Sequence, residues 1–334
     1  MNCQQFARAL PAAVLAGFML AMTAVSPAQS EGDPAAGYPS RPIKLIVGFA
    51  AGGGNDLFAR LIGQKFSENL AQSVVIENKP GAGGRIAVDF VKRQPADGYT
   101  VMVAATGQMA IAAAIYKKLT YHPTRDFVPL TMIANFPLVL AGPASDEIKT
   151  VKDLVAYAKA NPDKANYATS SPAFVIATEL FKLKTGIPGV GIPYKSSNEM
   201  MLAVAGGNVL YTIADGPPTV PLVKAGKIRA LAVTGSQRSH EFPDVPSMAE
   251  AGYPEVDVGL WSGLFVVNGT PPAIVNKLEV EWRRVLADPG VRDKLKGMAV
   301  NPGGGPGEEF RKLIDADIKK FSDIVAAAKL DFPQ

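Results

Sequence analysis

A glycine-rich turn early in the sequence has the composition of an anion-binding site. Three glycines at positions 52–54 follow an apolar run and precede Asn55 and Asp56. Glycines let the backbone approach a ligand closely, and a helix that begins after them presents unpaired N–H groups at its positive end. Asn55 is a favourable N-cap for a helix that begins at Asp56. The turn is therefore predicted to hold an anionic group.

Two later loops repeat this pattern. The segments 80–84 (PGAGG) and 105–108 (ATGQ) also follow apolar runs, and the loops at 49–56, 80–85 and 105–108 contain only one basic residue, Arg85. A triphosphate usually needs more positive charge, whereas backbone N–H groups and hydroxyls can hold a carboxylate. The three loops together predict a carboxylate site, and the alternative is that the glycines only form tight turns.

Motifs for catalysis are sparse. No Lys-Ser or Lys-Thr pair follows the first turn, as a P-loop requires, and Leu57 breaks the G-x-G-x-x-G dinucleotide pattern. The two histidines, His122 and His240, lie among turn residues and are predicted to be surface or packing residues. We therefore predict no catalytic residue, no bound metal and no cofactor.

One acidic residue has a suggestive position. Asp215 ends the apolar run 209–214 and precedes two prolines. Binding residues often lie where a strand ends, so Asp215 is a candidate for the site. The alternative is that Asp215 caps the helix that follows it.

The N-terminus reads as a secretory leader. Residues 1–28 contain Arg8, an apolar stretch and a small-residue cleavage site that ends at Ala28. Its removal takes away Cys3, the only cysteine, and leaves 33 basic and 30 acidic side chains from the 34 and 30 of the whole chain. This balance is too even to suggest a nucleic-acid partner. The remaining residues are predicted to form a soluble protein of the periplasm.

The elements around the loops predict an α/β fold. Strands are expected at 43–49, 73–78 and 99–106, each followed by a glycine turn and a helix, with the third helix ending near Lys117. Such units build a parallel, doubly wound sheet. A second set alternates helices with strands, and its expected elements are helices 149–161, 174–186, 197–207 and 220–226 and strands 165–170, 189–194, 209–215 and 228–235.

Two apolar segments, 136–142 and 258–267, bracket the second set and are predicted to cross between two lobes. Helices at 273–287 and 308–328 would return to the first lobe, and Thr270 is expected to cap the first of them. Lobe 1 is thus predicted at 29–140 and 264–334, and lobe 2 at 141–263.

The ordered motifs resemble the Bug family, the TctC-like solute receptors of tripartite tricarboxylate transporters. The resemblance covers essentially all of the chain after the leader. The motifs that carry it are IKLIVGFAAGGGND, VVIENKPGAGG, PADGYT, LVAYAKANPDKANYATS, IPYK, KAGKIRALAVTG, FPDVPSMAEAGYP and TPPAIVNKL.

The resemblance implies a two-lobed periplasmic binding protein of the Venus flytrap type that closes on an organic acid and delivers it to membrane permease subunits. It also implies ligand-binding residues in matching loops of both lobes. These residues are Phe49, Ala51, Gly52, Gly53, Asn55, Asp56, Gly81, Gly83, Thr106, Gln108, Thr169, Ser170, Ser171, Tyr194 and Asp215.

The chain departs from the family at TSSPAFV, residues 169–175, where relatives have a longer glycine-rich turn followed by a histidine. Phe174 at this turn and Trp261 on the second crossing are predicted to line the cleft, which favours an acid with an aromatic or apolar body. The alternative places Phe174 in the core of the second lobe, because it begins an amphipathic helix. The receptor is expected to be a monomer. A signalling receptor and, with less support, an α/β enzyme are the other functions considered.

Overall fold

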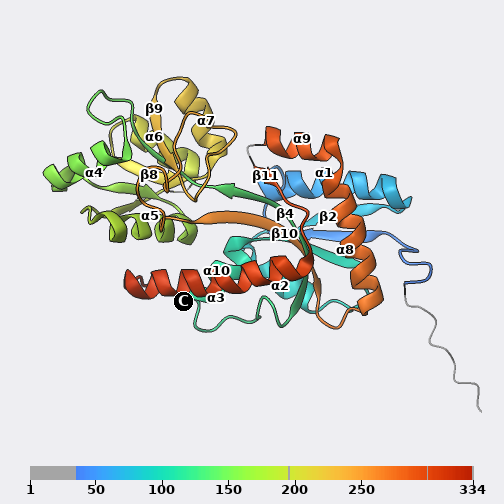
Figure 1. Cartoon of the computed structure of the whole chain (residues 1–334). Coiled ribbons are helices and arrows are strands. Elements are labelled where there is room, and N and C mark those ends of the chain that lie inside the picture. The colour runs from blue at the N-terminus through green and yellow to red at the C-terminus, as the bar shows by residue number, and fades with distance from the viewer. Residues whose placement is uncertain (1–34, 195, 299, 333–334) are drawn as a thin grey trace, which may run out of the picture. The chain divides into compact units, whose positions relative to one another are not determined.

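The computed structural model describes residues 35–194, 196–298 and 300–332, so the leader predicted at 1–28 lies outside the described residues. The chain divides into two units, Met1–Asp33 and Pro34–Gln334. All the helices and strands described below belong to the second unit (Figure 1).

Eleven strands of the described residues form two sheets. The first sheet has the order β11-β4-β10-β3-β1-β2, and the second has the order β7-β6-β8-β5-β9. Strands of the first sheet are β1 (Ile43–Val47), β2 (Val74–Asn78), β3 (Thr100–Ala105), β4 (Phe127–Pro137), β10 (Gly259–Val267) and β11 (Asn301–Pro302). Strands of the second sheet are β5 (Val139–Pro143), β6 (Tyr167–Thr169), β7 (Gly191–Pro193), β8 (Tyr211–Ala214) and β9 (Ile228–Val233).

Helices cover both faces of each sheet. The helices that accompany the first sheet are α1 (Gly54–Leu70), η1 (Ala82–Gly84), α2 (Arg85–Lys92), η2 (Gly107–Ile111), α3 (Ala112–Ile115), α8 (Pro272–Ala287), α9 (Pro289–Gly297) and α10 (Gly307–Ala327). Those of the second sheet are α4 (Val151–Ala160), η3 (Pro162–Lys164), α5 (Pro172–Thr185), α6 (Ser197–Ala205) and α7 (Gly216–Lys224). Helices α6 and α7 contact each other on one face of the second sheet, and α5 lies on the other (Figure 1).

Alternation along β1 explains why the first sheet is covered on both sides. Leu45 and Val47 belong to the buried cluster that includes residues of α1 and α8, whereas Ile46 belongs to the cluster that includes residues of α2 and α10. Successive side chains of a strand point to opposite faces, so the apolar run Leu45–Val47 has to be buried on both faces of the sheet. The α/β architecture with two sheets is therefore confirmed.

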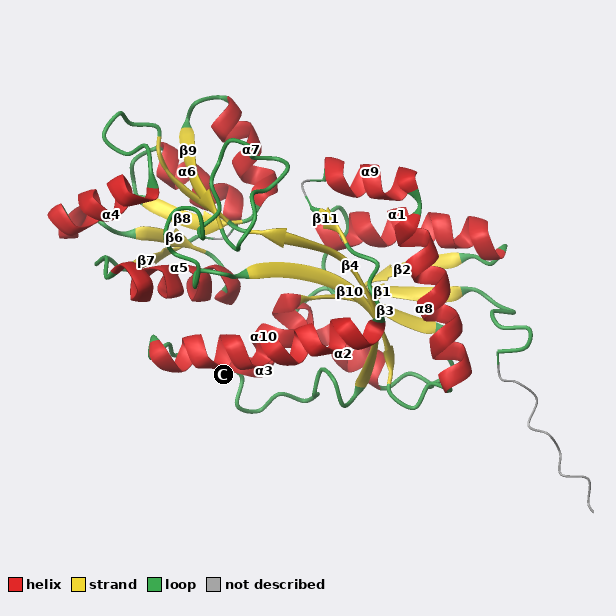
Figure 2. Cartoon of the chain, viewed as in Figure 1, coloured by secondary structure: helices red, strands yellow, loops and turns green. Residues whose placement is uncertain are grey.

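The sheets are mixed rather than purely parallel. Strands β2, β1 and β3 run parallel as predicted, but β10 pairs antiparallel with both β3 and β4. In the second sheet, β5 likewise runs antiparallel to β8 and β9. Only the end of β4 was predicted, as part of the crossing segment 136–142. The antiparallel pairing of β4 with β10, the other crossing strand, makes the first sheet mixed (Figure 2).

The predicted crossings lie where the chain changes sheets. Leu138 joins β4 of the first sheet to β5 of the second, and the chain re-enters the first sheet at Gly259. The predicted lobe boundaries at 140/141 and 263/264 fall inside β5 and β10, and the division into two lobes stays a prediction.

Thr234 ties the two crossing segments together. Its hydroxyl accepts from the Leu138 N–H (2.7 Å) and donates to the Val258 carbonyl (2.7 Å), and its own N–H donates to the Leu138 carbonyl (2.8 Å). The side chain is buried, so water cannot replace these partners.

Thr234→Val is expected to lower the free energy of unfolding by about 1–3 kcal/mol, because it leaves the Leu138 N–H and the Val258 carbonyl buried without a partner. Urea denaturation of the wild type and the variant measures the difference. Thr234→Ser keeps the hydroxyl and serves as the control. A Thr234→Val protein as stable as the Ser variant would show that the tie contributes nothing.

The predicted cap of α8 is wrong. Thr270 donates its hydroxyl to the Val267 carbonyl, and Pro271 occupies the N-cap position without a side-chain cap. Pro272 is the first helical residue, a position where the missing N–H costs nothing.

Candidate functional site

The three predicted loops meet at one edge of the first sheet. Strands β1, β2 and β3 run parallel and are neighbours, so the turns after Val47, Asn78 and Ala105 lie side by side. Asn78 joins two of these turns, because its side-chain amide donates to the Phe49 carbonyl (3.0 Å) and to Asp56 Oδ1 (3.0 Å). The sequence therefore placed these loops correctly next to one another.

The Asp56 carboxylate holds the first turn in place through hydrogen bonds. Its carboxylate accepts from the Gly52 N–H (2.8 Å) and from Arg60 Nε (2.9 Å) as well as from Asn78. The hydrogen bond from Arg60 is the largest cause that lowers the pKa of Asp56, to about 2, with further contributions from Gly52 and Asn78. Asp56 is only 1% exposed, and its hydrogen bonds shape the turn.

The Asp56 network predicts a loss of stability in acid. A carboxyl group whose pKa is depressed in the folded state stabilises the protein above its unfolded pKa of about 4, and this contribution disappears as the pH falls towards 2. We expect Asp56→Asn to be less stable than the wild type at pH 6 and to approach it at pH 2, as measured by urea denaturation. The exposed Asp163, exchanged for asparagine, is the control, and a constant gap between wild type and Asp56→Asn would contradict the prediction.

The helix that follows this turn begins earlier than expected. Helix α1 starts at Gly54 with Gly53 as its N-cap, so Asn55 lies inside the first turn and caps nothing. Instead, Asn55 Oδ1 accepts a hydrogen bond from the Ser262 hydroxyl of β10. This contact connects the first turn to the strand that returns from the second sheet.

Gln108 braces the second and third loops. Its side-chain oxygen accepts from the Ala105 N–H (2.8 Å), and its Nε2 donates to the Gly84 carbonyl (3.0 Å). Its main-chain carbonyl accepts from the Tyr121 hydroxyl (2.6 Å). Gln108 is completely buried, and its hydrogen bonds hold the two loops in register.

A cavity of about 330 Å³ lies between these loops and the second sheet. Its size falls within the range of small-molecule sites. The walls are mainly apolar and uncharged, and both sheets and their helices contribute to them. The lining residues are Phe49, Asn55, Ala82, Gly83, Arg85, Ala105, Thr106, Gly107, Ile111, Ala112, Ile115, Tyr116, Phe136, Ser171, Pro172, Ala173, Asp215, Leu260 and Trp261.

The cavity brings together seven of the residues predicted for the site: Phe49, Asn55, Gly83, Thr106, Ser171, Asp215 and Trp261. The other predicted residues do not line it: Ala51, Gly52, Gly53, Asp56, Gly81, Gln108, Thr169, Ser170, Phe174 and Tyr194. Among the latter, Asp56 and Gln108 support the lining loops through the hydrogen bonds described above. The ligand-binding role of all these residues stays a prediction.

Thr106 and Trp261 form one fixed wall. The Thr106 hydroxyl accepts from the Trp261 N–H (2.6 Å) and donates to the Trp261 carbonyl (3.1 Å), which fastens β10 to the third loop. The indole N–H donates to Asp317 Oδ2 of α10 (2.8 Å), and Phe310 meets the ring edge-on at 4.8 Å. Trp261 is 2% exposed, so the cavity reaches only a small part of it.

Asp215 brings a carboxyl group into the cavity from the second sheet. It occupies the N-cap position of α7, but its side chain makes no capping hydrogen bond, which does not support the alternative of a helix cap. Its Oδ1 is buried and has no hydrogen-bond partner among the described residues. Burial raises the pKa of Asp215, while a hydrogen bond from Ser197 lowers it to a smaller degree.

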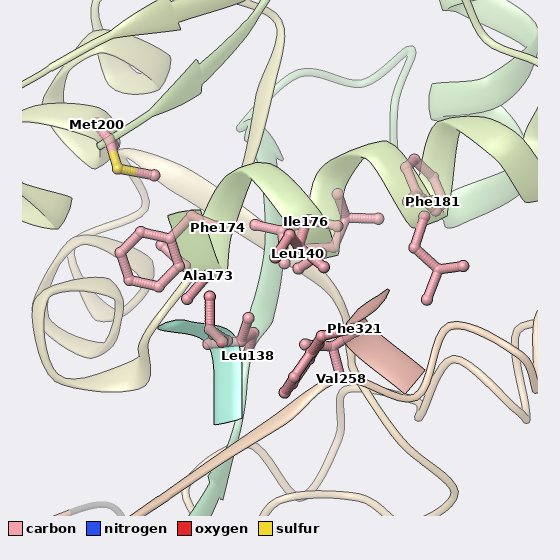
Figure 3. Packing of buried hydrophobic residues seen from close by; sticks show 14 of the residues in the cluster. Leu138, Leu140, Ala173, Phe174, Ile176, Phe181, Met200, Val258 and Phe321 are labelled. Atoms are coloured by element: carbon pink, nitrogen blue, oxygen red, sulfur yellow. The ribbon is translucent and has the colours of Figure 1, made fainter. Parts of the chain in front are cut away.

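Phe174 lies in the protein core instead of lining the cavity. Its ring belongs to the same buried cluster as Leu138 and Met200, and it is only 9% exposed (Figure 3). Helix α5 begins at Pro172, and Pro172 and Ala173 are the residues of its first turn that reach the cavity. The expectation that an aromatic ring here favours aromatic ligands is therefore not supported.

Comparisons with known proteins identify the family. The model of the tripartite tricarboxylate transporter family receptor, TctC, matches residues 58–330. The chain belongs to this receptor family. It is 33% identical to Protein BugT of Bordetella pertussis over 292 residues, which cover 86% of this chain and 89% of BugT.

Solved structures of similar receptors share the fold. Rpa4515 of R. palustris with adipate has a TM-score of 0.77 and 35% identity and covers 88% of this chain and 99% of its own. MatC (Rpa3494) of Rhodopseudomonas palustris, with bound malate, has a TM-score of 0.73 and 30% identity and covers 86% of this chain and all of its own. The resemblance drawn from the sequence motifs is thus confirmed, and so is the periplasmic binding protein fold.

Sequence reasoning missed Arg85 and the apolar wall of this receptor. Arg85 lines the cavity and lies with Cζ 3.8 Å from the centroid of the Tyr116 ring, while its Nε donates to the Ala82 carbonyl (3.0 Å). The signal for Arg85 was present, since it is the one basic residue within the loops 49–56, 80–85 and 105–108. The apolar wall of Ile111, Ala112, Ile115, Phe136 and Leu260 carried no comparable signal.

Across the described part of the receptor, no group of histidine, cysteine, aspartate and glutamate side chains is arranged to hold a metal ion. No helix within residues 35–194, 196–298 and 300–332 is long and apolar enough to cross a membrane.

Proposed function

We propose that this receptor captures a small organic carboxylate in the cavity between its two sheets and delivers it to the membrane permease subunits of a tripartite tricarboxylate transporter. The observation that carries the proposal is the cavity itself, which three turns of the first sheet line together with the first turn of α5 and with Asp215, the residue before α7. Rpa4515 with adipate and MatC with malate support the carboxylate class.

Capture would follow from the chemistry of the lining groups. Arg85 offers a cation beside the loops, and the first turn of α1 offers N–H groups that have no acceptor within the helix. Movement of the second sheet towards the first would exclude water and strengthen each charged hydrogen bond. Micromolar affinity corresponds to about 8 kcal/mol, which a few such bonds and the burial of an apolar chain can supply.

Titration calorimetry of the purified receptor tests this function. We expect binding of at least one of adipate, malate and hexanoate, and no binding of the neutral control hexan-1-ol. Equal binding of the alcohol, or no heat from any carboxylate in this panel together with no rise in melting temperature, would reject the proposal.

Location in the periplasm depends on the predicted leader. Intact-mass analysis of the exported protein is expected to show a chain that begins at Gln29, because the small residues before it form a cleavage site. A secreted chain that retains Met1 would contradict this expectation. Cross-linking of the ligand-loaded receptor in cells then separates delivery to a permease from docking to a sensor protein, and a monomeric state can be measured on the same sample.

A further inference from the structure

The cavity carries opposite charges on its two sides. Of its lining residues only Arg85 and Asp215 have ionisable groups with a formal charge at neutral pH, Arg85 from α2 of the first sheet and Asp215 from the end of β8 in the second. The walls between them are largely aliphatic and aromatic. A ligand that spans the cavity therefore meets a cation at one end, a carboxyl group at the other and apolar surface along its body.

Arg85 is prepared to hold a carboxylate. Its Nε is occupied by the Ala82 carbonyl, and its guanidinium stacks 3.8 Å from the centroid of the Tyr116 ring, so its plane is fixed from two sides. It makes no ion pair with any described residue. An arginine has five N–H groups, so those on the two terminal nitrogens remain for the paired hydrogen bonds that a carboxylate accepts.

Asp215 needs a hydrogen-bond donor from the ligand. Its Oδ1 is buried at the cavity and accepts no hydrogen bond from the described residues. Ser197 donates a hydrogen bond to the carboxyl group, but not to this oxygen. An ionised carboxylate can only accept hydrogen bonds, and leaving one of its oxygens without a donor in an apolar site is costly. A second carboxylate at this end would add repulsion between like charges, whereas a hydroxyl or an ammonium group would supply the missing donor.

We propose that the ligand is an organic acid whose carboxylate binds Arg85 and whose far end donates a hydrogen bond to Asp215. This inference rests on the proposed function, since it takes the cavity as the binding site. It makes Asp215 the residue that discriminates between acids of similar length, and it favours hydroxy or amino acids with an apolar chain over plain acids and dicarboxylates.

A matched ligand series tests the discrimination on the wild-type receptor. The probes are hexanoate, 6-hydroxyhexanoate, 6-aminohexanoate and adipate, together with the corresponding pentanoate set, and affinity is measured by titration calorimetry. We expect a hydroxy or amino acid to bind at least about tenfold more tightly than the plain acid and the dicarboxylate of equal length, which corresponds to about 1.4 kcal/mol. The hydroxy and amino arms identify which donor the site takes.

Asp215→Asn supplies the second arm, because it keeps the shape of the side chain, removes the charge and adds an N–H donor. We expect Asp215→Asn to weaken the binding of 6-aminohexanoate and to strengthen the binding of adipate. The affinity for 6-hydroxyhexanoate should change little, because the amide oxygen still accepts a hydrogen bond from the hydroxyl. Arg85→Gln should weaken all the acids alike. Asp163→Asn, an exposed change outside the cavity, is the control.

The outcomes separate this inference from the proposed function. Carboxylates that bind with no preference for a donor at the far end, and that respond equally to Asp215→Asn, would overturn the role of Asp215 while leaving carboxylate capture intact. The absence of binding by every acid would reject the proposed function itself. The ligand series needs only the wild type, so the test does not depend on the stability of the variants.

Discussion

Replacing Phe174 with alanine is expected to lower the free energy of unfolding by about 3 kcal/mol. The ring is 9% exposed and packs in the buried cluster with Leu138 and Met200, so its removal leaves a cavity in the core. Because the ring does not line the binding cavity, we expect the affinity for a carboxylate to change by less than about threefold, or 0.7 kcal/mol. Urea denaturation and calorimetry on the same preparation measure the two quantities.

Tyr116→Ala is the matched control, because it removes an aromatic ring of similar size that does line the cavity. Tyr116 is only partly buried and stacks with Arg85, so its loss should weaken carboxylate binding more than it weakens the fold. Weak binding by Phe174→Ala with an unchanged stability would instead place the Phe174 ring at the ligand.

Phe174 shows which features of helix α5 could be predicted from the sequence. The pattern of Phe174, Ile176 and Phe181 predicted an amphipathic helix, and that helix exists as α5. Whether its first aromatic ring faces the core or the cleft depends on the direction of the helix axis, which tertiary packing sets. Since a helical residue turns by about a quarter of a circle from its neighbour, Ala173 reaches the cavity while Phe174 does not.

The mixed first sheet was harder to foresee than its parallel half. The glycine turns after β1, β2 and β3 are local signals, and the structure places these strands as predicted. Strand β4 contains Pro129 and Pro137, residues that usually argue against an inner strand. Strand β11 pairs with β4 only at Ala134 and Asn135, so both prolines lie outside that pairing.

The apolar wall of the cavity could not be predicted from the sequence for another reason. Residues 107–111 form a π-helix, which changes the angular spacing of side chains before α3 begins. Ile111, Ala112 and Ile115 line the cavity at the end of this π-helix and in α3, so their direction relative to β3 differs from that of a regular helix begun at Gly107. The binding loops could be located from their glycines, but the shape of the space between them could not.

Replacing Gly84 with alanine is expected to lower both the stability of the fold and the affinity for the ligand. Gly84 has φ of +89°, and an added Cβ would lie 2.4 Å from Gln108 Nε2 and 2.6 Å from Gln108 Cδ. The left-handed backbone costs about 1–2 kcal/mol with a side chain, and displacing Gln108 removes buried hydrogen bonds worth about 1–3 kcal/mol more. We expect a loss of about 3 kcal/mol in the free energy of unfolding, the sum of these two effects.

The affinity for the ligand should fall together with the stability in Gly84→Ala. Gln108 holds the second and third loops together through the Gly84 carbonyl and the Ala105 N–H. Both loops line the cavity, so a shift of either one misplaces the lining groups by part of an ångström or more. We expect at least a tenfold weaker affinity for a bound carboxylate, about 1.4 kcal/mol, measured by calorimetry at a temperature where the variant is folded.

Gly83→Ala separates strain from the contact with Gln108. Gly83 also has a positive φ, of +64°, but an added Cβ would have no atom within 4 Å, so only the backbone strain of about 1–2 kcal/mol remains. A second check combines Gly84→Ala with Gln108→Ala, which removes the obstructing side chain. If the clash is the cause, this double variant should lose less stability than the sum of the two single variants, because the added methyl then has room. Strict additivity, or equal losses for Gly83→Ala and Gly84→Ala, would mean that backbone strain alone explains the effect and that Gln108 does not brace the loops.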